Sequence, residues 1–246
     1  MGFWPVVLNV LRNSDVVLLV VDARVPSVAQ NSEILDKCDK MGKRLVLVFN
    51  KIDLVSGEIL KELKVEYPDS FFVSALKKNG VKNLKQGLVE MSEEWKRDSL
   101  RVGIVGYPNA GKSALINVLV PGSDLKVKNV SGTTKKTAWI RNGALRIMDS
   151  PGVIPSGDGK IALGLTSSKD PHKMKNVESV AFSLLRMDRV GKSVRDFYGV
   201  SEEEDYDAFE AIGKVKGFLL KGGVVDEDRT AIRIVEDWQK GRISLR

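Results

Sequence analysis

Residues 106–113, GYPNAGKS, have the spacing Gly-x-x-x-x-Gly-Lys-Ser of a loop that binds phosphate. They stand between a β-branched run at 102–105 and the start of a helical pattern. Small residues in such a loop let successive backbone N–H groups meet phosphate oxygens. Lys112 would reach the β- and γ-phosphates of a nucleotide, and Ser113 would bind Mg²⁺. The remaining phosphate contacts are expected from Asn109, Ala110, Gly111 and Ala114.

A second motif, DSPG at 149–152, directly follows the strand-like run LRIM. A carboxylate at the C-terminal end of a strand is placed to hold Mg²⁺ through water, and the N–H of Gly152 can meet a γ-phosphate. The same four residue types also make ordinary turns. Because the motif stands downstream of the phosphate loop, we interpret Asp149 and Gly152 as members of the nucleotide site.

The segment between these motifs, KVKNVSGTTKKTAWIR, contains a candidate switch. Thr134, or alternatively Thr133, would supply the second protein ligand of Mg²⁺ and sense the γ-phosphate. Residues 126–148 include six basic residues and no acidic one. This pattern is typical either of a solvated basic face or of a surface that contacts a nucleic-acid backbone beside the nucleotide.

The stretch NKID at 50–53 has the residues needed to recognise guanine. It follows the run RLVLVF, at the end of the strand where α/β sheets bind ligands. Asn50, Lys51 and Asp53 are the candidates, and the Asp53 carboxylate would accept N–H bonds that adenine cannot offer. Loss of such a charge-assisted pair costs on the order of a few kcal/mol, which is enough to select GTP over ATP.

A shorter motif, SAL at 74–76, follows the run FFV. Ala75 would offer its N–H to the guanine carbonyl, with Ser74 and Leu76 beside it. Three residues are specific only as part of a fixed succession of motifs at strand ends.

The elements that must position these motifs alternate along the chain. Apolar, mostly β-branched runs predict strands at 16–21, 45–49, 70–73, 102–105 and 145–148. The segments between them are long enough for crossover helices, so we predict an α/β fold with a doubly wound, mostly parallel sheet. The exception is 139–148, which predicts a hairpin around Asn-Gly and hence one antiparallel strand.

Beyond about residue 170 the pattern becomes helical. Apolar residues recur at helical spacing at 208, 212, 215 and 219 and again at 232, 235 and 238. SEEE at 201–204 has the form of a capping box that starts a helix, and KGG at 221–223 that of a helix stop. We therefore predict a GTPase-type domain at 1–170 and a small all-helical domain at 171–246.

The ordered set NKID, SAL, GYPNAGKS, GTT and DSPG resembles that of the circularly permuted GTPases. DARVP at 22–26 and the segment 209–231 resemble the YlqF/RbgA-like branch. Permutation explains why the guanine motif precedes the phosphate loop: the usual ends are joined near 87–101, and permutation at exposed loops is tolerated.

This resemblance implies a permuted P-loop GTPase sheet followed by a helical RNA-binding domain, in a protein that assists maturation of the large ribosomal subunit. It assigns Asn50, Lys51 and Asp53 to guanine. It also implies that Lys112, Thr134 and Gly152 act in catalysis, with Ser113, Thr134 and Asp149 on Mg²⁺. Asn109 matches an asparagine that ligates K⁺ in related GTPases, although loop turn chemistry explains it as well.

Two departures from the family pattern bear on mechanism. Val153 follows the DxxG motif where Ras-like proteins have a glutamine that orients the attacking water, and Ile154 comes next. We therefore expect slow intrinsic hydrolysis that a partner, with or without K⁺, accelerates. Many relatives also carry a catalytic histidine in an N-terminal extension; the only histidine here is His172, in a predicted linker, and it receives no role. Arg24 would approach the nucleotide or a partner, or else pair with a neighbouring helix.

Composition narrows the class of protein. The 246 residues include 39 Lys and Arg against 32 Asp and Glu, a net charge of +7 that favours a polyanionic partner such as nucleic acid. The family resemblance implies that this partner is rRNA. The charge is uneven: residues 176–246 have 12 basic and 14 acidic residues, whereas 1–175 have 27 and 18. Electrostatics thus favour the GTPase part for RNA contact. A single cysteine and an opening apolar run broken by polar residues predict a cytoplasmic protein without a membrane span, and we expect a monomer.

Three functions fit these observations. The first is a GTP-hydrolysing factor that binds the large ribosomal subunit or its precursor. The second is a guanine-nucleotide switch that recruits a protein effector, with slow turnover between GTP and GDP as a timer. The third is a nucleotide-binding scaffold with negligible catalysis, which Val153 would allow. The basic segment around Thr134 favours the first.

Overall fold

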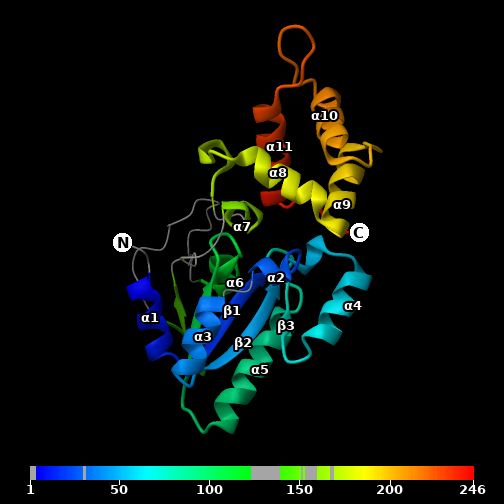
Figure 1. The fold of residues 1–246 in the computed structure, drawn as a ribbon. Coiled ribbons are helices and arrows are strands. Elements are labelled where there is room, and N and C mark those ends of the chain that lie inside the picture. Colours follow the sequence, from blue (N-terminus) through cyan, green and yellow to red (C-terminus); the bar gives the residue numbers. More distant parts are fainter. Residues whose placement is uncertain (1–3, 30–31, 123–138, 151, 153–159, 167–168) are drawn as a thin grey trace.

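The computed structural model describes residues 4–29, 32–122, 139–150, 152, 160–166 and 169–246, and it has one six-stranded sheet (Figure 1). The strand order is β3-β2-β1-β4-β6-β5. The strands are β1 (Val16–Asp22), β2 (Arg44–Asn50), β3 (Phe71–Phe72), β4 (Leu100–Gly106), β5 (Trp139–Asn142) and β6 (Leu145–Asp149). All pairs are parallel except β5 with β6, which confirms the predicted hairpin.

Both faces of this sheet are covered by helices. In β1, Val17, Leu19 and Val21 belong to one apolar cluster, while Val16, Leu18 and Val20 belong to the other. The first face packs against α1 (Trp4–Asn13), α3 (Ser32–Lys40) and α4 (Gly57–Glu66). The second packs against α5 (Val81–Glu94) and α6 (Lys112–Leu119). A continuous apolar strand is what a doubly wound sheet requires, so the predicted fold class is confirmed.

One predicted strand is shorter than expected. The run at 70–73 pairs with β2 only through Phe71 and Phe72. The chain then turns into a loop that is closed by an antiparallel bridge between Ser74 and Asn79. The end of β3 therefore brings SAL directly to the edge where β2 ends.

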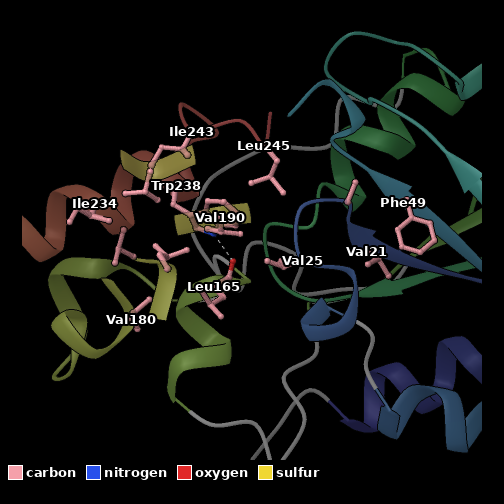
Figure 2. Packing of buried hydrophobic residues seen from close by; sticks show 14 of the residues in the cluster. Val21, Val25, Phe49, Leu165, Val180, Val190, Ile234, Trp238, Ile243 and Leu245 are labelled. Carbon is pink, nitrogen blue, oxygen red and sulfur yellow. Dashed lines mark hydrogen bonds between the residues drawn. The ribbon is translucent and has the colours of Figure 1, made fainter. Parts of the chain in front are cut away.

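The C-terminal part of the chain is helical and lies at one end of the sheet (Figure 1). Its elements are α7 (Lys160–Leu165), η2 (Pro171–Lys173), α8 (Val177–Arg186), α9 (Asp188–Tyr198), α10 (Asp205–Val215) and α11 (Glu227–Gln239). Figure 2 shows the buried side chains of this group, among them Val180, Ile234 and Trp238. They join the core of the sheet through Val25 and Leu165, so one apolar cluster extends across both parts.

The predicted division at residue 170 crosses a region of close packing. The indole Nε1 of Trp238 donates to the carbonyl of Leu165 at 2.9 Å (Figure 2), and a Cβ on Gly164 would lie 2.5 Å from Val180. Helix α7 thus packs with the helical group although it precedes residue 170. No helix within the described ranges is long and apolar enough to cross a membrane.

Two local predictions in the helical part were wrong. α10 begins at Asp205, and Glu204 at its N-cap makes no side-chain capping bond, so SEEE is not a capping box. The reason is tertiary: the Arg195 guanidinium donates to the backbone carbonyls of Glu202 and Glu203, both at 2.8 Å, and these contacts hold both residues outside the helix.

The KGG prediction failed for a local reason. α10 already ends at Val215, and Gly217 follows with φ +67°. Gly222 and Gly223 instead form the turn of a short hairpin closed by the bridge between Leu219 and Val225. Val215 and Leu219, predicted to be on the apolar face of a helix, are therefore half exposed.

Candidate functional site

The phosphate loop joins β4 to α6 and is shaped by close backbone approaches. Gly106 has φ +141°, and a Cβ there would lie 2.4 Å from the carbonyl oxygen of Val20. Gly111, the N-cap of α6, has φ +97°, and its Cβ would lie 2.1 Å from Nδ2 of Asn50. Both positions therefore require glycine, as the motif predicts. The loop leads directly into the N-terminus of α6, and a helix N-terminus is suited to bind an anion.

Lys112 lies buried in the centre of this loop. Its Nζ donates to the carbonyls of Gly106 at 3.0 Å and Tyr107 at 2.7 Å. Burial lowers the pKa of Lys112 to about 8, although the nearby Asp149 carboxylate acts in the opposite direction. An anionic ligand in the loop would raise the pKa of Lys112 again, because an opposite charge favours the ammonium.

The two described residues predicted to bind Mg²⁺ are in direct contact. The Oγ of Ser113, at the start of α6, donates to Oδ2 of Asp149, at the end of β6, at 3.1 Å. A hydroxyl and a carboxylate are oxygen ligands that suit a hard cation. Within the described ranges no group of three or more His, Cys, Asp or Glu residues could hold a metal ion. The hydroxyl of Ser113 and the carboxylate of Asp149, which lie in contact, fit an Mg²⁺ that also takes oxygens from a bound nucleotide.

Ser150 and Gly152 of the DSPG motif lie against β4 and the phosphate loop. The N–H of Ser150 donates to the carbonyl of Ile104 at 3.2 Å, and a Cβ on Gly152 would lie 2.6 Å from the backbone nitrogen of Pro108. Gly152 therefore lies against the phosphate loop. Thr133, Thr134, Val153 and Ile154 lie outside the described residues.

The asparagine of NKID connects the guanine motif to both neighbouring loops. Asn50 Nδ2 donates to the carbonyl of Ala110 at 2.8 Å, and Asn50 Oδ1 accepts from the N–H of Ala75 at 3.0 Å. In this arrangement Asn50 braces the phosphate loop against SAL, and the Ala75 N–H is bound to Asn50. The Oγ of Ser74 accepts from the N–H of Lys77, whereas Leu76 is exposed.

Lys51 has a left-handed backbone, φ +65°, and its Nζ lies 2.8 Å from Oδ2 of Asp22. Asp22 and Arg24 belong to DARVP. Burial alone would raise the pKa of Asp22, but the charges of Arg24 and Lys51 outweigh it and hold that pKa well below its usual value. Sequence analysis missed Asp22, since only the fold brings the end of β1 beside the end of β2.

Of the two roles expected for Arg24, contact with the nucleotide or a partner and pairing with a neighbouring helix, the structure shows the second. Its Nε and NH2 donate to the two oxygens of Asp22, at 3.1 and 2.9 Å, and its NH1 donates to the carbonyl of Trp238 in α11 at 2.7 Å. The guanidinium also lies over the Trp238 ring, 3.9 Å from its centroid. Arg24 thus binds a neighbouring helix.

His172 is exposed, and its Nε2 lies 3.0 Å from Oε1 of Glu236.

The motifs meet at a cavity of about 730 Å³. Asn50, Lys51, Asp53, Ala75, Leu76, Asn109, Gly111 and Ala114 line it, so the structure brings together most of the predicted nucleotide contacts. Its volume is within the range of small-molecule sites. The cavity is also lined by residues from η2 and the end of α11, which sequence analysis missed. No local motif marks them, because only the docking of α11 brings them to the cavity.

Comparison with known proteins agrees with this geometry. The family model described as RsgA GTPase matches residues 7–156, more than half of the chain. The chain belongs to the RsgA GTPase family. A second model, described as 50S ribosome-binding GTPase, matches residues 101–214 of this family member. The order of its motifs, with base recognition ahead of phosphate binding, makes it a circularly permuted GTPase of the YlqF-like kind.

The solved structures show the same fold. YlqF from T. maritima, bound to GNP, superposes with a TM-score of 0.65 at 20% identity, covering 98% of this chain and 94% of YlqF. The GDP-bound form gives a TM-score of 0.65 at 21% identity, covering 97% and 95%. The permuted sheet and the helical C-terminal part are thus both present in YlqF.

Curated relatives extend beyond this chain. A GTP-binding protein of Methanocaldococcus jannaschii is 35% identical over 97% of this chain and 65% of its own length. Nucleolar GTP-binding protein 2 of Pneumocystis carinii is 29% identical over 98% of this chain and 52% of its own length. The chain therefore spans about half to two thirds of the relatives it matches.

Proposed function

We propose that this GTPase binds and hydrolyses GTP and assists assembly of the large ribosomal subunit by binding pre-ribosomal RNA or particles in its GTP form. The observation that carries the proposal is that NKID, SAL and the phosphate loop line one cavity. The named relatives support the ribosomal part: one is a nucleolar GTP-binding protein, and one family model is described as a 50S ribosome-binding GTPase. The basic segment 126–148 would contact the RNA backbone.

In this proposal the nucleotide is held at both ends. Asp53 pairs with the guanine ring, and the Asn50 brace keeps SAL and the phosphate loop at the spacing that one nucleotide requires. Lys112 binds the β- and γ-phosphates. Mg²⁺, held by Ser113, Asp149 and Thr134, would neutralise charge that develops on the transferred phosphoryl group.

Hydrolysis in this proposal depends on a partner. Val153 has no group to orient water, so Lys112, Thr134 and Gly152 stabilise the phosphoryl group while the ribosomal particle, with or without K⁺ on Asn109, completes the site. Intrinsic turnover is therefore slow. We further propose that residues 1–170 and 171–246 are the GTPase and helical domains of a cytoplasmic monomer.

A guanine-nucleotide switch that recruits a protein effector is the alternative. The observation that favours it is the set of exposed apolar side chains at the α10–α11 hairpin, Leu219, Leu220 and Val224. Such side chains would suit a protein partner. The two functions differ in whether ribosomal particles are the ligand of the GTP form.

Sedimentation with ribosomal subunits separates them. The chain is centrifuged with purified large and small subunits in GDP or in a non-hydrolysable GTP analogue. The proposal predicts that it co-sediments with the large subunit, or its precursor, only in the analogue, and that single-turnover hydrolysis accelerates with those particles. Absence of binding and of stimulation under every ionic condition would refute it.

A further inference from the structure

The nucleotide cavity has a second wall that comes from the C-terminal part of the chain. The end of α11 contributes Glu236, Gln239 and the C-cap residue Lys240 to it, and the region of η2 contributes Lys169 and Lys173. These side chains line the same cavity as Asp53 and Ala75, although they are far from them in sequence. Lysine and amide N–H groups are donors, and a nucleotide offers them ribose and phosphate oxygens.

This wall is attached directly to the guanine motif. A Cβ on Gly241, the residue after the C-cap of α11, would lie 2.9 Å from Cδ1 of Leu54. The N–H of Leu245 donates to the carbonyl of Leu54 at 2.7 Å, and Leu245 forms a parallel bridge with Val55. Leu54 directly follows Asp53. The position of the base-reading carboxylate and the position of the end of α11 are therefore coupled through adjacent residues.

A buried ionic group makes a second connection. Asp22 accepts from Lys51 of the guanine motif and from Arg24, while Arg24 also donates to the carbonyl of Trp238 in α11. The side chain of Arg24 is fully buried and that of Asp22 is 5% exposed. Movement of α11 away from the sheet would leave this guanidinium without its helix partner.

The wall is also held together internally. Gln239 Nε2 donates to the carbonyl of Lys169 at 3.0 Å and to that of Gly164 at 3.2 Å. Glu236 contacts both His172, at 3.0 Å, and Lys240, at 2.8 Å. These contacts tie η2 and the segment before it to the end of α11.

We propose that this C-terminal wall, residues 169–173 and 236–241, is part of the nucleotide-binding site and that it closes on the nucleoside of either GDP or GTP. The inference rests on the proposed guanine-nucleotide function. The described lining of the cavity includes the guanine motif but not Ser113, Asp149 or Gly152, where Mg²⁺ and the γ-phosphate would be bound. The wall thus contacts the nucleoside, which GDP and GTP share. Nucleotide binding therefore stabilises the docked position of α11, and docking of α11 in turn strengthens nucleotide binding.

Equilibrium binding of fluorescent GDP and of a fluorescent non-hydrolysable GTP analogue tests the wall. The test variant carries two substitutions, Lys173→Ala and Lys240→Ala, and both lysines are exposed. Its control is Lys214→Ala, which breaks a pair with Glu210 at 2.9 Å that has the same i,i+4 geometry as the pair of Lys240 with Glu236 at 2.8 Å.

We expect the double variant to weaken both nucleotides alike, by about fivefold in Kd, and the control to leave both unchanged. Unchanged affinity in the double variant would overturn the inference, as would weakening of the GTP analogue alone. Failure of the unsubstituted chain to bind either nucleotide would instead refute the proposed function. The two failures are thus distinguishable.

Hydrogen exchange tests the coupling in the reverse direction. Saturation with GDP is expected to slow exchange of the amides of 227–246, because a ligand that contacts the wall stabilises its docked position. The C-terminal half of α5 serves as the reference segment, because α5 packs on the face of the sheet opposite to α1, α3 and α4. Exchange in 227–246 that does not respond to GDP, while GDP binding itself is measured, would overturn the coupling.

Discussion

Replacement of Arg24 by alanine should destabilise the chain far more than loss of an exposed ion pair. Arg24 and Asp22 have side-chain exposures of 0% and 5%. Removal of one partner of a buried pair leaves an uncompensated buried charge and costs about 3–5 kcal/mol. Lys51 still neutralises part of the Asp22 charge, so the expected loss is at the lower end of that range.

Arg189 provides a matched control. It also joins the two parts of the chain, through two hydrogen bonds to Glu62, but those side chains are 51% and 56% exposed. Exposed pairs contribute less than about 1 kcal/mol. For chains of this size 1 kcal/mol shifts Tm by about 2–4 °C. Thermal unfolding should therefore show a Tm lower by about 6–12 °C in Arg24→Ala and by less than about 4 °C in Arg189→Ala.

The pH dependence supplies a second readout of the same prediction. The folded state holds the pKa of Asp22 below its unfolded value, so this stabilisation is present above the unfolded pKa and is lost as pH falls through the folded pKa. Arg24→Ala should flatten the loss of stability on acidification. Equal Tm values for the two arginine variants, or an unchanged acid profile, would refute the reasoning.

Three further changes test the phosphate loop and its brace. Lys112→Met should abolish nucleotide binding. A lysine whose folded pKa is lowered adds stability as pH rises, so the unsubstituted chain should gain unfolding free energy above about pH 8 and the variant should not. Denaturant titrations that give the same alkaline profile for both chains would contradict this. Gly111→Ala should weaken GDP binding at least tenfold by calorimetry, because its Cβ would meet Asn50 and φ is +97°. Asn50→Ala leaves the Ala110 carbonyl and the Ala75 N–H without their side-chain partner, so Tm should fall by an amount equivalent to about 1–3 kcal/mol, and an unaltered Tm would argue against the brace.

Local chemistry made much of the fold predictable. The apolar runs at 16–21 and 102–105 became central strands because burial on both faces requires an uninterrupted apolar sequence. The guanine and phosphate motifs were recognisable since each depends on a few residues at fixed spacing. Their meeting at one cavity then followed from parallel strands that end at the same edge.

Contacts between distant segments were not predictable. SEEE has a helix-start pattern, yet Arg195 binds the carbonyls of Glu202 and Glu203 and delays α10. Likewise, no pattern near Lys240 indicates that it would line the nucleotide cavity, because that position depends on the docking of α11 against Leu54. In both cases a tertiary contact, and not the local sequence, determines the structure.

Competition for fluorescent GDP tests the central claim most directly, namely that Asp53 and Lys112 act on the two ends of one guanine nucleotide. GTP should displace the probe at concentrations similar to those of GDP, whereas ATP should fail to displace it at a hundredfold excess. Asp53→Ala should abolish this preference for guanine over adenine nucleotides. Displacement by ATP as effective as that by GTP in the unsubstituted chain would contradict the account.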